Sequence, residues 1–367
     1  MRVYLFVMLV AAAVTYLATP LARRIAERSR AMTPVRDRDV HSVPTPRLGG
    51  LAMFAGLAAS FAVASQIPFL AGIFAESRQP WAILGAGAMV CLLGVADDIW
   101  GLDALSKLAG QVLAAGLLAW QGVQLVSLPL AGITVGSGRL FLVLTVVAVV
   151  VAINAVNIID GLDGLAAGVM AIGGAAFFVY TYRLTQDASP DDYSNLASLV
   201  VACLVGCCVG FLPHNFNPAR IFMGDSGAML LGLLLASSAI TVTGQVDPTV
   251  VSDARLVPAF FPVLLPVVVL LIPMVDLLLA VVRRVGAGQS PFTADRHHLH
   301  HRLLDLGHSH ARAVAIMYLW TAVVAFGAVS LAFVPAGVAL PIWVTAAVVS
   351  VLLTLGPLRG RRLTRRL

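Results

Sequence analysis

Long apolar stretches dominate the chain, and short polar segments separate them. The hydrocarbon core of a bilayer is about 30 Å thick and needs roughly 20 apolar residues per helix. About eleven stretches reach this length; they cover residues 3–22, 48–67, 80–96, 106–124, 139–156, 164–183, 196–213, 226–243, 256–284, 311–333 and 337–357. The pattern therefore predicts an all-α, polytopic integral membrane protein, with residues 1–367 forming a single transmembrane domain.

Composition agrees with this prediction and excludes an ordinary soluble domain. Of the 367 residues, 59% are hydrophobic and only 11% are charged, and the mean hydropathy is +0.93. The first apolar stretch is followed by Arg23-Arg24 and lacks a small-residue cleavage pattern, so we expect a retained helix rather than a signal peptide. The four cysteines fall inside predicted spans, which favours packing as small apolar side chains over a disulfide or metal role.

The arginines alternate by loop and predict an orientation. They are dense in the first loop, in the ninth loop and in the tail, whereas loops of the other parity contain only Arg78, Arg139, Arg183 and Arg255. The arginine-rich side is cytoplasmic by the positive-inside rule, which places the N-terminus outside and the C-terminus in the cytoplasm. The net charge of +6 then reflects topology and anionic lipid, and we expect no nucleic-acid partner.

Every chemically notable polar cluster falls in a loop on the arginine-rich side. Solvated loops that were unrelated would not all gather their polar residues on one face. We therefore predict one composite site at the cytoplasmic face, built from residues 41–50, 97–107, 157–164, 214–227 and 295–302.

Acidic residues at the mouths of apolar spans indicate metal and phosphate chemistry. Adjacent carboxylates at Asp97 and Asp98 can bind Mg²⁺, or one can act as a base; the alternative is a solvated loop. Asn154, Asn157, Asp160 and Asp163 recur every three residues, which would place them along one helical stripe; the alternative is simple turn chemistry.

Two further clusters suggest binding of anions. Asp225 precedes an apolar helix, where it can cap the helix N-terminus, and such an end also favours bound phosphate. In the segment Arg296-His-His-Leu-His-His-Arg302, helical spacing would put His297, His300 and His301 on one face. Zinc ligation is one interpretation, but the flanking arginines favour phosphate.

Taken together, these motifs resemble the polyprenyl-phosphate N-acetylhexosamine-1-phosphate transferases over nearly the whole chain. The resemblance rests on the His41–Gly50 loop, Asp97-Asp98, Asn157-Ile-Ile-Asp-Gly-Leu-Asp-Gly164, Phe222-Met-Gly-Asp-Ser-Gly227 and the segment Ser290–Arg302. The related phospho-muramoyl-pentapeptide transferases carry three consecutive histidines in the last segment. Here the order His-Leu-His-His-Arg resembles the N-acetylglucosamine branch.

The resemblance implies an activity and a location. N-acetylglucosamine 1-phosphate would pass from UDP-GlcNAc to undecaprenyl or decaprenyl phosphate, with release of UMP, as the first step of cell-envelope polysaccharide assembly. The enzyme would be Mg²⁺-dependent, with Mn²⁺ as an alternative ion, and would act at the cytoplasmic face of the bacterial inner membrane. A homodimer is left open.

The resemblance also implies residue roles. Asp225 would ligate Mg²⁺ with Asn157, Asp97 and Asp98. Asp160 and Asp163 would line the nucleotide and acceptor site, and Phe222 would stack on uracil. Substrate contacts would come from the remaining polar residues of the motifs, namely Asn154, His297, His298, His300, His301, Arg302, His41 and Arg47.

Two other functions remain as alternatives. One is the pentapeptide transferase, which shares the aspartate motifs. The other is a metal or proton transporter, in which acids should line a path through the middle of the bilayer. Only Asp276 lies inside a predicted span, which disfavours the transporter.

Overall fold

The structure, a computed structural model, describes residues 1–33, 44–125, 129–130, 133–134, 138–188, 194–243 and 306–364, with short pieces between residues 267 and 304. Apart from one antiparallel pair of two-residue strands, β1 (Pro129–Leu130) and β2 (Ile133–Thr134), the elements of this part are helices. They are α1 (Arg2–Ser29), α2 (Gly49–Ala64), α3 (Pro68–Glu76), α4 (Gln79–Trp100), α5 (Ala104–Trp120), α6 (Gly138–Ile159), α7 (Leu165–Ala188), α8 (Leu196–Asn215), α9 (Gly224–Thr243), α13 (His310–Phe333) and α14 (Ala336–Thr364).

The helices follow the predicted apolar stretches closely. Within the described residues, eight helices are long and apolar enough to cross a membrane, and the bent pair α2 and α3 would make a ninth. α5 also covers a predicted stretch but is shorter, and the stretch 256–284 with Asp276 lies largely outside the described residues. The polytopic membrane fold is therefore confirmed, whereas the count of eleven spans and the orientation stay predictions.

The sequence pattern did not predict α3 or the bend that precedes it. The predicted stretch 48–67 corresponds to α2, and a second helix, α3, follows after a short break at an angle of 103° to α2. Pro68 begins α3, where its missing N–H costs no helical hydrogen bond. Phe74 of α3 meets Phe61 of α2 and Trp81 of α4 edge-on, and these ring contacts fix the bend.

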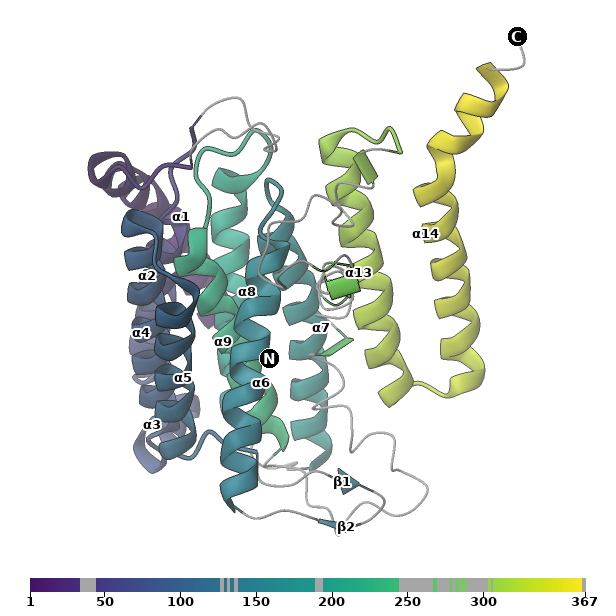
Figure 1. Cartoon of the computed structure of the whole chain (residues 1–367). Coiled ribbons are helices and arrows are strands. Elements are labelled where there is room, and N and C mark those ends of the chain that lie inside the picture. The colour runs from purple at the N-terminus through teal and green to yellow at the C-terminus, as the bar shows by residue number, and fades with distance from the viewer. Residues whose placement is uncertain are drawn as a thin grey trace.

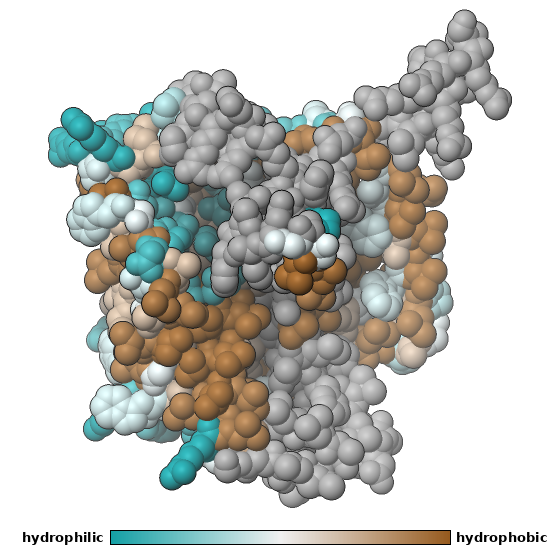
Figure 2. Space-filling model, viewed as in Figure 1, coloured by the Kyte–Doolittle hydropathy of each residue, from teal (hydrophilic) through white to brown (hydrophobic). Residues whose placement is uncertain are grey.

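Tryptophans mark the two ends of α4. Trp81 and Trp100 are exposed side chains separated by about 28 Å along the helix, at 1.5 Å per residue. This spacing matches the thickness of a hydrocarbon core, and tryptophans favour its two interfaces. Figure 2 shows hydrophobic side chains covering much of the lower part of one face, with hydrophilic side chains gathered above them.

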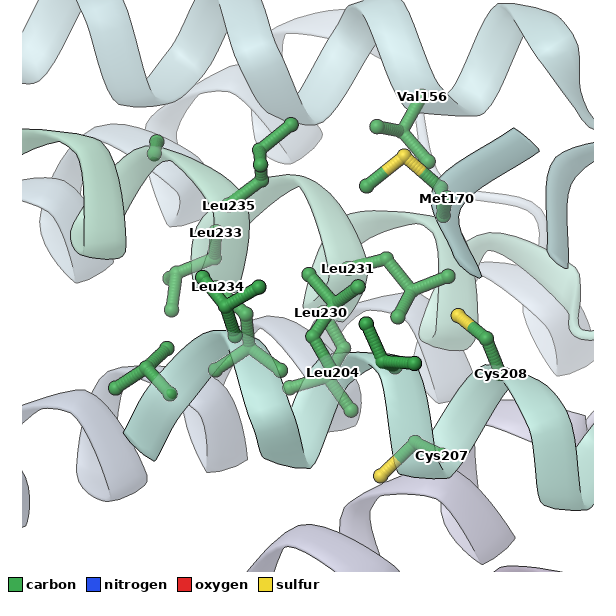
Figure 3. Packing of buried hydrophobic residues seen from close by; sticks show 14 of the residues in the cluster. Val156, Met170, Leu204, Cys207, Cys208, Leu230, Leu231, Leu233, Leu234 and Leu235 are labelled. Carbon is green, nitrogen blue, oxygen red and sulfur yellow. The ribbon is translucent and has the colours of Figure 1, made fainter. Parts of the chain in front are cut away.

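The core lies around α8 and α9, which run between the α1–α2–α4 group and the α6–α7 group (Figure 1). α9 is almost wholly buried, whereas α14 is the outermost helix and packs on α13. Figure 3 shows leucines of α9 beside Leu204 and Cys208 of α8 and Met170 of α7. Cys207 points to the other side of α8, where its thiol lies 3.2 Å from the carbonyl oxygen of Met53 on α2. All four cysteines are free and buried, as the sequence predicted.

Two glycines let α8 approach α1 closely. A Cβ atom at Gly206 would lie 2.3 Å from the carbonyl oxygen of Met8, and one at Gly210 would lie 2.2 Å from that of Ala12. The spacing Gly206-Cys-Cys-Val-Gly210 is the small-residue pattern by which membrane helices bring their backbones together.

We expect Gly206→Val to separate α8 from α1 and to lower the melting temperature of the purified protein. Overpacking of this kind costs about 1–3 kcal/mol. Val209→Leu is the matched control, because Val209 lies on the same helix and is 48% exposed. Equal melting temperatures for the two variants, measured by intrinsic fluorescence in detergent, would contradict this account of the α1–α8 contact.

Candidate active site

The polar ends of four helices meet at one end of the bundle. Asp97 and Asp98 lie in the last turn of α4, and Lys107 lies in the first turn of α5. Asn157 lies near the end of α6, and Asp225 lies in the first turn of α9. These residues are far apart in the sequence, and their contacts place them within one cluster. The predicted convergence of the Asp97, Asn157 and Asp225 motifs is thus present in the structure.

Lys107 joins two of the aspartates. Its Nζ atom lies 2.7 Å from Asp97 Oδ2 and 2.8 Å from Asp225 Oδ2. Asp97 Oδ1 also accepts a hydrogen bond from the backbone N–H of Leu102 at 2.8 Å. The Asn157 side-chain amide lies 3.5 Å from Asp225 Oδ2. Two carboxylates from different helices therefore share one ammonium group.

Asp98 is directed away from this pair and into the start of α9. Its Oδ1 accepts from the backbone N–H of Asp225 at 3.2 Å, and its Oδ2 accepts from the N–H and the hydroxyl of Ser226 at 3.3 and 3.2 Å. The Nε atom of Arg47 lies 3.9 Å from Oδ1. The Asp98 side chain is fully buried, so both of its oxygens are used in holding the α9 N-terminus.

Glycines make this close approach feasible. A Cβ atom at Gly94 would lie 2.3 Å from the backbone of Ser226, and one at Gly50 would lie 2.2 Å from the backbone N of Gly227. Gly224 has a φ of +67°, and its Cα faces Asp98. The turn that carries Asp225 therefore packs between α2 and α4 in close backbone contact. This packing limits how far Asp225 can move.

A pocket opens beside the cluster. Its volume is about 300 Å³, and its lining consists of Thr33, Arg47, Asn157, Asp160, Gly161, Leu162, Phe222, Gly224 and Asp225. The chain around Arg47 pairs with the chain around Phe222, because the Phe222 N–H donates to Pro46 O at 2.8 Å and the Gly49 N–H donates to Phe222 O at 3.0 Å. This pairing holds Phe222 at the pocket wall.

The ionised form of Asp160 is disfavoured in this pocket. Burial raises its pKa to about 7, and the nearby carboxylates of Asp225, Asp98 and Asp163 act in the same direction. Arg47 opposes the shift. Near neutral pH, Asp160 is therefore divided between its protonated and ionised forms.

Asp163 and Asn154 do not line the pocket. Asp163 Oδ2 accepts from the Asn217 side chain at 2.9 Å and from the Ala219 N–H at 3.0 Å, so the residue braces the segment that leads to Phe222. Asn154 donates to Gln111 Oε1 at 2.7 Å, between α6 and α5. The stripe predicted from residue spacing thus divides, with Asn157 and Asp160 at the pocket and the other two in structural contacts.

Another set of predicted residues lies outside the described residues. His41 of the first loop and the histidine segment, namely His297, His298, His300, His301 and Arg302, belong to this set. Their roles stay predictions.

Sequence reasoning assigned no role to Lys107, although its contacts place it at the centre of the cluster. A signal was available, since Lys107 is the sole lysine in a chain with 24 lysines and arginines in total. A chain that uses arginine everywhere else has a specific reason for a lysine there. The contacts of Ser226 and Gln111 had no comparable signal.

Within the described residues, no group of three His, Cys, Asp or Glu side chains is arranged to hold a metal ion. Asp97 and Asp225 nevertheless converge on one positive charge, and Asn157 adds an amide. Mg²⁺ is commonly bound by one or two carboxylates together with substrate phosphates, so this oxygen-rich set fits Mg²⁺.

Comparison with known proteins identifies relatives of this chain. Residues 80–243 match the family model described as glycosyl transferase family 4. The decaprenyl-phosphate N-acetylglucosaminephosphotransferase of Mycobacterium leprae is 44% identical over 96% of this chain and 90% of its own length.

More distant relatives match as well. The probable undecaprenyl-phosphate N-acetylglucosaminyl 1-phosphate transferase of Bacillus subtilis is 30% identical over 82% of this chain and 77% of its own length. The phospho-N-acetylmuramoyl-pentapeptide-transferase of Desulforudis audaxviator is 31% identical, but over 65% of this chain and 77% of its own length.

The raised pKa of Asp160 predicts a pH-dependent stability in the absence of divalent metal. The native protein holds a proton on Asp160 up to about pH 7, whereas the unfolded chain releases it near the ordinary value of 3.8. The contribution of Asp160 is therefore fully present below about pH 4 and is lost as the pH rises to about 7.

We expect the melting temperature in EDTA to fall more steeply between pH 5 and 8 for the wild type than for Asp160→Asn, which does not titrate. Asp103→Asn is the control, because Asp103 is an exposed cap of α5 outside the pocket. Parallel curves for the wild type and Asp160→Asn would contradict the prediction.

Proposed function

This chain belongs to glycosyl transferase family 4 together with the relatives just described, and from that premise we propose that it transfers N-acetylglucosamine 1-phosphate from UDP-GlcNAc to a polyprenyl phosphate. An oxygen of the lipid phosphate attacks the β-phosphorus of the nucleotide sugar. The bond from that phosphorus to the bridging oxygen breaks, and UMP leaves with this oxygen. The product is a lipid diphosphate that carries N-acetylglucosamine. The relatives that are 44% and 43% identical favour decaprenyl phosphate as the acceptor.

The observation that carries the proposal is the Lys107 bridge between Asp97 and Asp225, beside a pocket at the end of a membrane bundle. A lipid phosphate lies at the membrane interface, and its nucleotide partner is soluble in water. The two can meet only at the end of a bundle. Transfer between two anions depends on positioning and on charges that offset their repulsion. The cluster supplies the positioning, and its bases together with a bound divalent cation would supply the positive charge.

Each residue of the cluster receives a role in this proposal. Asp225, Asp97 and Asn157 would hold Mg²⁺, which would neutralise charge on the diphosphate. Lys107 would exchange part of its contact with the carboxylates for the donor phosphates. Phe222 would stack on uracil from the pocket wall, and Arg47 would face the phosphates.

In this proposal Asp98 positions the start of α9 and acts neither as a metal ligand nor as a base. Its oxygens are occupied by Asp225 and Ser226, and it has no exposed side-chain surface. The acceptor phosphate is largely ionised near pH 7, since a phosphate monoester has a second pKa of about 6. The reaction therefore needs no strong base at this position.

We place the active site on the cytoplasmic face of the bacterial inner membrane, where arginine-rich loops and the nucleotide sugar coincide. His300, His301 and Arg302 are proposed to bind the diphosphate or the sugar, with His297 and His298 beside them. His41 is proposed to contact substrate from the first loop. Mn²⁺ is proposed to substitute for Mg²⁺.

The pentapeptide transferase is the weaker alternative, because those relatives are about as similar as the Bacillus subtilis protein but match a shorter part of the chain. The transporter is weaker still. The acids described here gather at one end of the bundle, whereas a transport path needs them at mid-membrane.

The proposed reaction predicts Mg²⁺-dependent release of UMP from UDP-GlcNAc by the purified protein with decaprenyl phosphate. Asp225→Asn keeps the size of the side chain and removes its charge, so we expect activity to fall at least about 100-fold, or roughly 3 kcal/mol of transition-state stabilisation. Turnover near the wild-type rate at saturating Mg²⁺ would contradict the ligand role. A preference for UDP-MurNAc-pentapeptide in the same assay would establish the alternative.

The two adjacent aspartates should behave differently. We expect Asp97→Asn to raise the Mg²⁺ concentration needed for half-maximal rate, because a ligand is lost. Asp98→Asn should lower kcat and the melting temperature with little change in that concentration. Its amide would face donors of Asp225 or Ser226, and leaving a buried donor unpaired costs about 1–3 kcal/mol. Identical Mg²⁺ and thermal profiles for the two variants would refute this division of roles; Asp103→Asn is the control.

A further inference from the structure

A second polar contact lies one helical turn away from the Lys107 cluster, further along α5 and nearer the start of α6. Gln111 follows Lys107 by four residues on α5, and Asn154 precedes Asn157 by three residues on α6. The Asn154 side-chain amide donates to Gln111 Oε1 at 2.7 Å and to the carbonyl oxygen of Val150 at 2.8 Å. Because side chains three or four residues apart share a helix face, α5 and α6 face each other through two successive polar layers.

α5 has few other means of fixing its position. Within the described residues it packs mainly on α4 and α6, and Leu105 and Leu113 on its outer side are 76% and 66% exposed. Apolar contacts allow a helix to slide or rotate at little cost when lipid can replace the lost neighbours. A hydrogen bond between buried amides allows one alignment, and such bonds contribute about 0.6 kcal/mol on average and up to about 1.7 kcal/mol between membrane helices.

The alignment of α5 decides where the Lys107 ammonium lies. A shift of one residue along the helix moves every group by about 1.5 Å, which is large against the contacts of 2.7 and 2.8 Å with Asp97 and Asp225. Gln111 is buried, with 3% of its surface exposed, so its side chain is committed to this contact.

We propose that Gln111 and Asn154 are positioning residues, forming a register lock between α5 and α6 that keeps Lys107 between Asp97 and Asp225. The proposal rests on the proposed function for its catalytic consequence. Its structural part is independent, since it concerns the placement of one amine.

The amine can be followed directly, because Lys107 is the sole lysine of the chain. A lysine held by two carboxylates reacts slowly with an amine acylating reagent. We expect Gln111→Leu and Asn154→Leu each to raise the acylation rate of Lys107 about tenfold, measured by peptide mass spectrometry on the purified full chain without substrate. The double variant should react no faster than either single variant, because each single change already removes the lock.

A variant of similar kind separates the lock from general loss of stability. Thr145 on α6 is buried, and its hydroxyl accepts from the N–H of Leu125, just beyond α5, at 2.9 Å. Thr145→Val therefore removes a polar contact between the same regions at a distance from Lys107. It should lower the melting temperature and leave the acylation rate unchanged. The double exchange Gln111→Asn with Asn154→Gln keeps an amide pair, so acylation of Lys107 should be slow again. This variant also tests the proposal if the leucine variants do not fold.

Activity gives a second measurement. Gln111→Leu should lower kcat for UMP release about tenfold or more in the wild-type background. In the Lys107→Met background the same change should lower kcat less than about twofold, because the effects of mutations at residues that act through one another are not additive. Unchanged acylation in Gln111→Leu, equal acceleration in Thr145→Val, or additive losses of kcat would overturn the lock. Failure of the wild type to release UMP would reject the proposed function alone, since the acylation result needs no turnover.

Discussion

The cost of placing charge at the end of an apolar bundle governs this structure. An ionised group there is stable only when it has partners, and Lys107 supplies them for Asp97 and Asp225 at once. These three side chains come from α4, α5 and α9, and Asn157 adds α6. This small network therefore joins the four helices that form the site. Displacement of any one of these helices would leave a charged side chain on another helix without its partner.

Close backbone packing supports the network from the opposite side. Gly50 and Gly94 bring α2 and α4 against the turn at Ser226, where a larger side chain would clash. Asp98 then closes the contact by accepting hydrogen bonds from this turn. The result is a rigid base under Asp225, and the more exposed Lys107 and Arg47 complete the site on the pocket side. Rigidity of this kind favours catalysis by positioned charge.

Hydropathy and loop charge predicted the membrane fold and the gathering of the acidic motifs, because both depend on physical rules that act over whole segments. They did not predict which side chains meet. The period of three that links Asn154, Asn157, Asp160 and Asp163 was read as one functional stripe, yet Asn154 bonds Gln111 and Asp163 bonds the segment at Asn217. Periodicity defines the face on which a residue lies, but the partner depends on the neighbouring helix. Pro68 marks the start of α3 in the sequence, but the angle between α2 and α3 depends on ring contacts with residues of α2 and α4 that local sequence does not specify.

The balance of charge explains why a cation suits this site. Four acids, Asp97, Asp98, Asp160 and Asp225, surround the pocket and its cluster, against two bases, Lys107 and Arg47. With all six ionised, the sum is 2 − 4 = −2, which would repel a diphosphate. Burial is the main cause that raises the pKa of Asp160 to about 7, and the surrounding carboxylates add to the shift. A divalent ion would cancel the excess negative charge. Lysine rather than arginine then suits the central position, because a compact ammonium on a flexible stem can give up its carboxylates to an ion and turn toward a phosphate, whereas a planar guanidinium binds as a fixed fork.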